Sequence, residues 1–197
     1  YIYNKKMKKE YTDISLSNTI RKDNSFPSDF KAYTGQILCR GVDIRIDQHG
    51  TWFYQNSRIN RIELVKLFAK ALHRDDDGNY WLITPTEICH VTVEEAPFII
   101  TDLTVLNSGQ NQTIQFKTNV GTIIDLDKEY LIKIENKKTF MKPKPFLTLG
   151  NYPEAKLSRP VFYELVDLCQ NIKINNIMKF GVWSKNNFFI LGPSVDV

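Results

Sequence analysis

The chain reads SRINRIELVKLF at residues 57–68 and SRPVFYELVDLC at residues 158–169. The two stretches align without a gap and share six residues at an offset of 101 positions. In both stretches, apolar residues recur at the three- and four-residue spacing of an amphipathic helix. Because the offset is about half of the 197 residues, the repeat predicts two related lobes with one helix each. Chance is the alternative, since a chain of average composition yields about one match of this quality.

Alternating apolar and polar residues predict β-strands around both helices. Val42, Ile44 and Ile46 share one face of a strand, and a turn at His49-Gly50 leads into a second hairpin arm at 51–54. The helices are expected at about 60–72 and 159–171. An aromatic strand follows each helix, and the remaining strands are expected at 97–105, 112–118, 120–124, 130–134, 146–149 and 187–191.

These elements predict an α+β fold of two similar small lobes, each with antiparallel hairpins packed on one helix. The predicted organisation is a flexible N-terminal segment at 1–30, an N-terminal lobe at 31–106 and a C-terminal lobe at 107–197. The turn at 107–110 marks the boundary between the lobes. No glycine-rich phosphate loop joins a strand to a helix, which argues against a Rossmann or P-loop domain.

Composition and charge exclude two classes of partner. Hydrophobic residues make up 42% of the chain and charged residues 24%, as in an ordinary globular protein. No apolar run approaches the roughly 18 residues that a membrane span needs. Four lysines and one glutamate in residues 1–10 supply +3 of the net charge of +4. The rest of the chain therefore lacks the concentrated basic face of a nucleic-acid-binding protein.

The cysteines bear on the cellular compartment. Cys39, Cys89 and Cys169 lie far apart, and no two of them form a Cys-x-x-Cys pair. An odd number at wide spacing predicts free thiols in a reducing cytoplasm.

Several short sequences together resemble one bacterial family. They read VDIRI at 42–46, GTWFY at 50–54, YWLITP at 80–85, VEEAPF at 93–98, FKTN at 116–119, RPVFYELV at 159–166 and GVWS at 181–184. The pattern resembles the family called domain of unknown function 1285. This resemblance implies two similar small α+β lobes and no known activity. The chain departs from the family pattern at Arg58, where proline is favoured, and at Gly150, where a basic residue is more usual.

Three arginines at or before the helix starts are candidate ligand-binding residues. A helix N-terminus presents free backbone N–H groups and a positive dipole end, and both favour anions. A guanidinium adds a rigid donor pair for phosphate or carboxylate. The alternative is that each arginine pairs within the chain with Glu63, Glu94 or Glu164. The candidate ligand-binding set is Arg58, Arg61, Thr84, Arg159 and Trp183.

A carboxylate-rich segment at 84–98 is the candidate for catalysis. Paired carboxylates beside a histidine perform acid–base chemistry when burial separates their pKa values. The alternative is a polar crossover bent by Pro85 and Pro97. The candidate catalytic residues are Glu87, His90, Glu94 and Glu95. Neither the histidine spacing nor any glycine-rich motif predicts a metal or a cofactor.

The sequence favours a cytoplasmic, non-catalytic module with a regulatory or signalling role. Its expected partner is a small anionic ligand or another protein, bound between the two lobes. The alternative is a small-molecule enzyme that uses the carboxylates at 84–98. Neither nucleic acid nor a membrane is an expected partner, and self-association is left open.

Overall fold

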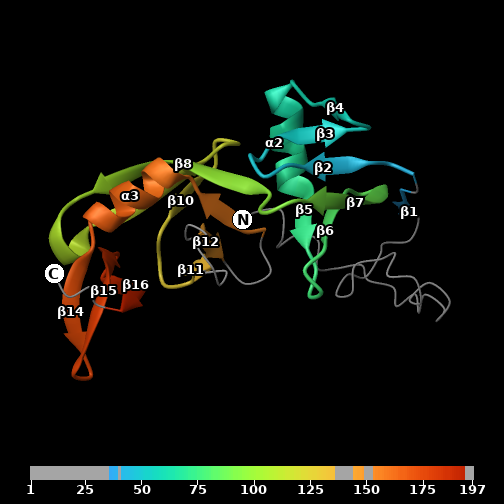
Figure 1. The fold of residues 1–197 in the computed structure, drawn as a ribbon. Helices are drawn as coiled ribbons and strands as arrows, with labels where there is room; N and C mark the ends of the chain where they lie inside the picture. Colours follow the sequence, from blue (N-terminus) through green and yellow to red (C-terminus); the bar gives the residue numbers. More distant parts are fainter. Residues whose placement is uncertain (1–35, 40, 136–143, 149–152, 194–197) are drawn as a thin grey trace.

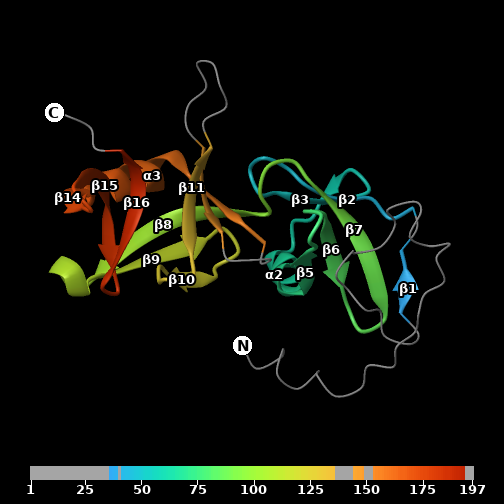
Figure 2. The same ribbon diagram turned by 90° about the horizontal axis from the view of Figure 1, so that it is seen from below.

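The computed structural model describes residues 36–39, 41–135, 144–148 and 153–193. Within these residues the strands form three sheets, which lie in a row along the molecule (Figures 1 and 2). The predicted flexible segment at 1–30 lies outside the described residues. No helix of the described residues is long and apolar enough to cross a membrane.

The first sheet has seven strands in the order β4-β3-β2-β7-β6-β5, and β1 also pairs with β7. Helix α2 packs against this sheet (Figure 1). The elements of the first half are β1 (Ile37–Leu38), β2 (Ile44–Ile46), β3 (Trp52–Tyr54), β4 (Ser57–Arg58), α2 (Ile62–Ala71), β5 (Leu72–Arg74), β6 (Tyr80–Ile83) and β7 (Glu87–Val93).

The second half holds a six-stranded sheet in the order β10-β9-β8-β13-β12-β11 and a three-stranded sheet in the order β14-β15-β16. Helix α3 packs against β8 and β15, so it contacts both sheets. The elements are β8 (Phe98–Leu106), η2 (Gly109–Asn111), β9 (Thr113–Thr118), β10 (Ile123–Asp125), β11 (Leu131–Glu135), β12 (Lys144–Thr148), β13 (Ala155–Leu157), α3 (Arg159–Asp167), β14 (Gln170–Ile174), β15 (Ile177–Ser184) and β16 (Asn187–Pro193).

The predicted fold class, an α+β fold with antiparallel hairpins packed on one helix in each lobe, is wrong. Strands dominate the described residues, which contain two α-helices and three sheets. Three strand pairs, β1–β7, β2–β7 and β8–β13, are parallel. A hairpin joins only antiparallel neighbours, so these pairs need longer connections across the sheet. The alternating pattern identified the strands but carried no information about which strand pairs with which.

The repeat does not extend to the topology around the helices. Helix α2 lies between two strands of one sheet, whereas α3 follows β13 of one sheet and precedes β14 of another. The strand topology therefore gives an internal duplication no support. The sheets change between β7 and β8, at residues 94–97, whereas the predicted boundary at 107 follows β8.

Two hydrophobic cores correspond to the two halves. The first core contains the predicted buried face of β2, since Ile44 and Ile46 are 5% and 0% exposed. The second core packs Leu165 of α3 against strands of both neighbouring sheets. It is extended by Ser184, which accepts a hydrogen bond from the Ile114 amide and donates one to the Leu126 carbonyl. The three-stranded sheet is therefore fixed to the six-stranded sheet through a fully satisfied buried hydroxyl.

The two halves meet at the turn before β3. Gly50 has a φ of +72°, and a Cβ there would lie 2.6 Å from the side-chain nitrogen of Asn119. That nitrogen donates a hydrogen bond of 3.1 Å to the Gly50 carbonyl. Val120, in the same turn as Asn119, is 6% exposed and belongs to the first core. Glycine is therefore required at position 50 both by its backbone angle and by the close approach of the second half.

Candidate functional site

The three candidate arginines are exposed and make no ion pair with any described residue. Arg58 ends β4, Arg61 is the N-cap residue of α2, and Arg159 is the first residue of α3. The other two arginines of the described residues behave differently. Arg45 contacts Glu94 at 2.7 Å, and Arg74 lies 4.0 Å from Glu154. The arginines at the helix starts are thus left available to a ligand.

Two of the three acids proposed as internal partners are held by other cations. Glu63 pairs with Lys66 at 3.2 Å, one helical turn away. Glu94 accepts from Arg45 and also from the Gln48 amide at 3.0 Å. Glu164 is exposed on α3 and makes no ion pair with the described residues. Within the described residues, intramolecular ion pairs therefore do not account for the three arginines.

Both helix starts lack a side-chain cap among the described residues. In α2 the Arg61 carbonyl accepts from the amides of Leu64 and Val65, which leaves the amides of Ile62 and Glu63 without an intrahelical acceptor. The helix expected at about 60–72 begins at Ile62, and Arg61 is its N-cap residue. Free amides at a helix N-terminus favour an anion, and Arg58 and Arg61 lie four residues and one residue before Ile62 in the chain.

The structure does not bring the other two candidate ligand-binding residues to the arginines. Thr84 lies in the turn between β6 and β7, where its hydroxyl accepts a 2.9 Å hydrogen bond from the Glu87 amide. Trp183 lies on β15, with its ring centroid 5.2 Å from that of Phe188. The β6–β7 turn and β15 are at opposite ends of the molecule (Figures 1 and 2). These two residues therefore cannot line one site together.

The four candidate catalytic residues do not converge either. Glu87 and His90 are three positions apart on β7, so their side chains leave opposite faces of the sheet. The His90 ring packs edge-on against Trp81 at 5.1 Å. Among the described residues, the ligand atoms of these four side chains form no metal-binding group of three. An acid–base site at 84–98 remains a sequence prediction without an assembled geometry.

Glu95 instead joins the two halves. Its carboxylate pairs with Lys144 of β12 and with Lys156 of β13, the latter at 2.5 Å. Lys156 also donates to the Gln48 carbonyl at 2.8 Å. Burial by itself would raise the pKa of Glu95, but the hydrogen bonds from the two lysines outweigh it and hold the pKa below its ordinary value. No local pattern predicts this cluster, because Lys144 and Lys156 lie 49 and 61 residues from Glu95 in the chain.

A second polar contact across the halves involves a tyrosine. The Tyr80 hydroxyl donates to Glu154 at 3.3 Å, and the Arg74 guanidinium lies 6.0 Å from the Tyr80 ring centroid. Burial and the neighbouring Glu154 carboxylate raise the pKa of Tyr80 above its usual range, although Arg74 opposes the shift. A tyrosine held neutral in this way serves as a hydrogen-bond donor between the halves.

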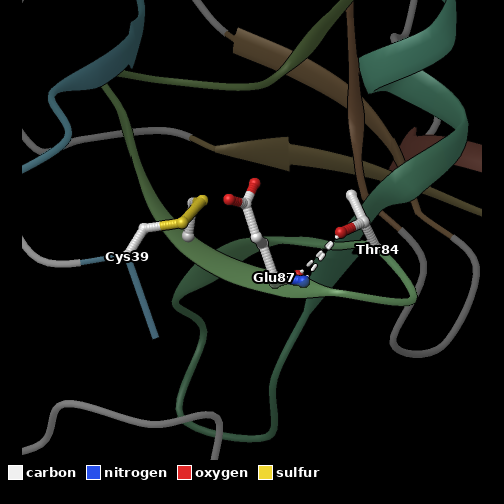
Figure 3. Close-up of a disulfide and its surroundings, with 4 residues drawn as sticks. Cys39, Thr84 and Glu87 are labelled. Carbon is white, nitrogen blue, oxygen red and sulfur yellow. Dashed lines mark hydrogen bonds between the residues drawn. A yellow bond between two sulfur atoms is a disulfide. The ribbon is translucent and has the colours of Figure 1, made fainter. Parts of the chain in front are cut away.

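The prediction of three free thiols is wrong for two of them. Cys39 and Cys89 form a disulfide, with their Cα atoms 4.8 Å apart (Figure 3). Cys169 is free and half-buried, and burial raises the pKa of its thiol to about 12. Cys169 is therefore an inert core thiol. The pairing was invisible in the sequence because it depends on the register between β1 and β7.

The fold defines a mostly β protein of two parts, and the arginines at its helix starts form no ion pair with the described residues. The model described as "Domain of unknown function (DUF1285), N-terminal domain" matches residues 37–96. The model described as "Protein of unknown function (DUF1285), C-terminal domain" matches residues 97–191. The chain belongs to the DUF1285 family, which confirms the resemblance seen in the sequence.

Two solved structures resemble this chain. A DUF1285 family protein from Silicibacter pomeroyi DSS-3 is 33% identical, with a TM-score of 0.70 over 80% of this chain and 84% of that chain. A DUF1285 family protein from Shewanella baltica OS155 is 28% identical, with a TM-score of 0.51 over 64% of this chain and 92% of that chain. No curated protein matches the chain at a significant level.

Proposed function

We propose that this chain is a non-catalytic, regulatory module that binds a small anionic ligand at the start of α2. The observation that carries the proposal is the pair Arg58 and Arg61, both exposed and both without an acidic partner among the described residues. Two guanidinium groups three residues apart offer donors from two directions to one phosphate or carboxylate. The uncapped amides of Ile62 and Glu63 supply further donors with the helix dipole behind them.

The start of α3 is the weaker of the two helix starts. It carries one arginine, Arg159, and the next residue, Pro160, has no amide hydrogen to offer. We therefore assign the principal contacts to α2. A ligand held between the halves requires Arg61 and Arg159 to act on the same molecule.

A thermal-shift series tests the principal site. Inorganic phosphate, a nucleoside triphosphate and a dicarboxylate are each added to the wild type and to Arg58→Ala, Arg61→Ala and Lys70→Ala. Lys70 is the matched control because it is an exposed cation at the other end of the same helix. A ligand at ten times its Kd stabilises the native state by about 1.4 kcal/mol. We expect both arginine variants to lose this stabilisation and Lys70→Ala to keep it.

Two outcomes count against the site at α2. If the stabilisation survives in both arginine variants, the ligand binds elsewhere. If Lys70→Ala loses as much ligand-induced stabilisation as Arg61→Ala does, the ligand responds to the general positive charge of the helix and not to a specific site.

Isothermal titration decides whether Arg159 shares the ligand. Arg61→Ala, Arg159→Ala and the double variant are compared with the wild type in a double-mutant cycle. A shared ligand predicts one ligand per chain and a coupling energy between the two substitutions. Additive losses, or a second ligand that only Arg159→Ala removes, would show two separate sites.

A further inference from the structure

Three potential metal-ligand atoms gather at one edge of β7. Cys39, just after β1, lies opposite Cys89 in the parallel register that pairs Ile37 with Glu87 and Leu38 with Ile88. The two sulfur atoms and a carboxylate oxygen of Glu87 all lie within 4.8 Å of one another. Figure 3 shows the Glu87 carboxylate on the same side of β7 as the disulfide.

The backbone holds these residues in place independently of the disulfide. The Ile37 amide donates to the Thr86 carbonyl and the Cys39 amide to the Ile88 carbonyl, each at 2.9 Å. Two hydrogen bonds of 2.9 Å join Glu87 to Thr84. The Thr84 hydroxyl accepts from the Glu87 amide, and the Thr84 amide donates to the Glu87 carbonyl. When the sulfur–sulfur bond opens, the three side chains therefore stay close together.

The charges at this edge favour a cation when both cysteines of the opened disulfide are thiolates. The Glu87 carboxylate makes no ion pair with a described residue. Two thiolates added beside it would place three anionic groups within 4.8 Å of one another. Such a group repels itself in the absence of a bound cation.

We propose that Cys39, Cys89 and Glu87 form a redox-controlled site for a soft divalent cation of the zinc class. In the oxidised chain the two sulfur atoms are bonded to each other and cannot act as thiolate ligands. In the reduced chain they supply two thiolates and Glu87 supplies one carboxylate oxygen. Thiolate and carboxylate ligands both suit Zn²⁺, and three protein ligands leave a fourth tetrahedral position for water.

The reduction uses an external dithiol and balances as thiol–disulfide exchange. A thiolate of the dithiol attacks the sulfur of Cys39, because Cys39 is a half-buried residue, whereas Cys89 is only 8% exposed. The bond to Cys89 breaks and Cys89 leaves as a thiolate. The second thiol of the dithiol then attacks its own mixed-disulfide sulfur, releases Cys39 and closes the reagent as a disulfide. Two electrons pass to the protein, and cation binding releases two protons from the cysteine thiols.

Cadmium titration of the full chain tests the site. Cd²⁺ is the probe because thiolate coordination gives it an ultraviolet charge-transfer absorption. The protein is reduced, freed of reductant and titrated, and an oxidised sample is titrated in parallel. We expect one Cd²⁺ per reduced chain with the thiolate absorption, and neither binding nor absorption in the oxidised chain. Competition with a chromophoric chelator then gives the affinity for Zn²⁺.

Three variants assign the ligands. Cys39→Ser should remove the thiolate absorption, and Glu87→Gln should weaken Zn²⁺ binding by at least about tenfold, since even outer contacts to metal ligands cost that much. Cys169→Ser is the matched control and should bind as the wild type does, because Cys169 belongs to the other half. Glu87 is exposed, so Glu87→Gln leaves the fold intact even if a cysteine variant does not fold.

The proposal is overturned by any of three results. Reduced wild type that binds no Cd²⁺ has no site. Equal binding in Cys39→Ser or in the oxidised chain places the cation elsewhere. If Glu87→Gln binds Zn²⁺ with unchanged affinity, the Glu87 carboxylate is not a ligand and the three-ligand site does not exist.

Discussion

The two stretches that share six residues start their helices in different ways. After Ser57-Arg58 the chain stays extended, since these residues form β4 and the Ile59 amide donates to the Trp52 carbonyl. Helix α2 then begins at Ile62. After Ser158 the chain turns at once, and Arg159 is already the first residue of α3. The same Ser-Arg pair therefore ends a strand in one half and begins a helix in the other.

The residue after the arginine explains the difference. Ile59 has an amide hydrogen and completes the pairing with β3. Pro160 has no amide hydrogen, and its fixed φ suits the first turn of a helix. The two helix starts also differ in charge, because Arg61 of the first stretch aligns with Phe162 of the second. Helix α2 therefore begins with two arginines before its first turn, whereas α3 begins with one.

The largest expected effect concerns a leucine that both stretches contain. Leu165 of α3 is 0% exposed, whereas the aligned Leu64 of α2 is only half-buried. Leu165→Ala should lower the free energy of unfolding by about 3 kcal/mol, because it leaves a cavity in the second core. Leu64→Ala should cost about 1 kcal/mol, since water already reaches the side chain. Urea unfolding of the two variants measures the difference.

Equal losses for the two leucines would contradict this comparison. They would show that the two helices are buried to the same depth in solution. Glu63→Ala is the reference variant. It removes an exposed side chain of α2 and takes no packing contact away from the first core.

A change at the N-cap of α2 separates stability from binding. Arg61 has the extended backbone of an N-cap, with φ −81° and ψ 101°, but no side-chain cap. Arg61→Asp should stabilise the protein by about 1 kcal/mol, because the carboxylate accepts from the free amides and complements the dipole. The same variant should lose the anionic ligand. Thermal unfolding with and without phosphate measures both effects, and a variant that is less stable yet still binds would refute the assignment.

The smallest expected effect tests the role of the proline. Pro160→Ala should destabilise the protein by about 0.5 kcal/mol, because the unfolded chain gains conformational freedom while α3 keeps its hydrogen bonds. Differential scanning calorimetry measures the loss, with Ser158→Ala as a reference change at the same helix start, because the Ser158 side chain makes no cap hydrogen bond. A loss of several kcal/mol would mean that Pro160 also sets the packing of α3.

Local sequence patterns predicted many of the strands and helices, but few of the pairings between strands. The alternation at 42–46 became β2, in which Ile44 and Ile46 are buried and Arg45 between them is only partly buried. The aromatic run at 80–83 became β6, which is buried over its first three residues. Strand β14 was missed because Cys169 and Ile172 continue the apolar stripe of α3. The helix ends at Asp167, and residues 170–174 pair with β15 instead.

Long-range contacts escaped the sequence for a different reason. The disulfide joins cysteines 50 residues apart, and the Glu95 cluster joins β12 and β13 to the segment after β7. Such contacts depend on strand order and register, which hydrophobic periodicity does not encode. The arginine candidates could be found because a helix start is a local feature, whereas their lack of acidic partners required the structure.

Nuclear magnetic resonance of the amide groups tests directly whether an anion binds at the start of α2. The full chain is titrated with inorganic phosphate while the amide signals of Ile62 and Glu63 are followed. We expect both amide signals to shift to saturation with one shared Kd in the wild type and to remain unshifted in Arg61→Ala. Saturable binding that leaves these two amides unmoved, or movement that persists in Arg61→Ala, would contradict an anion site at the start of α2.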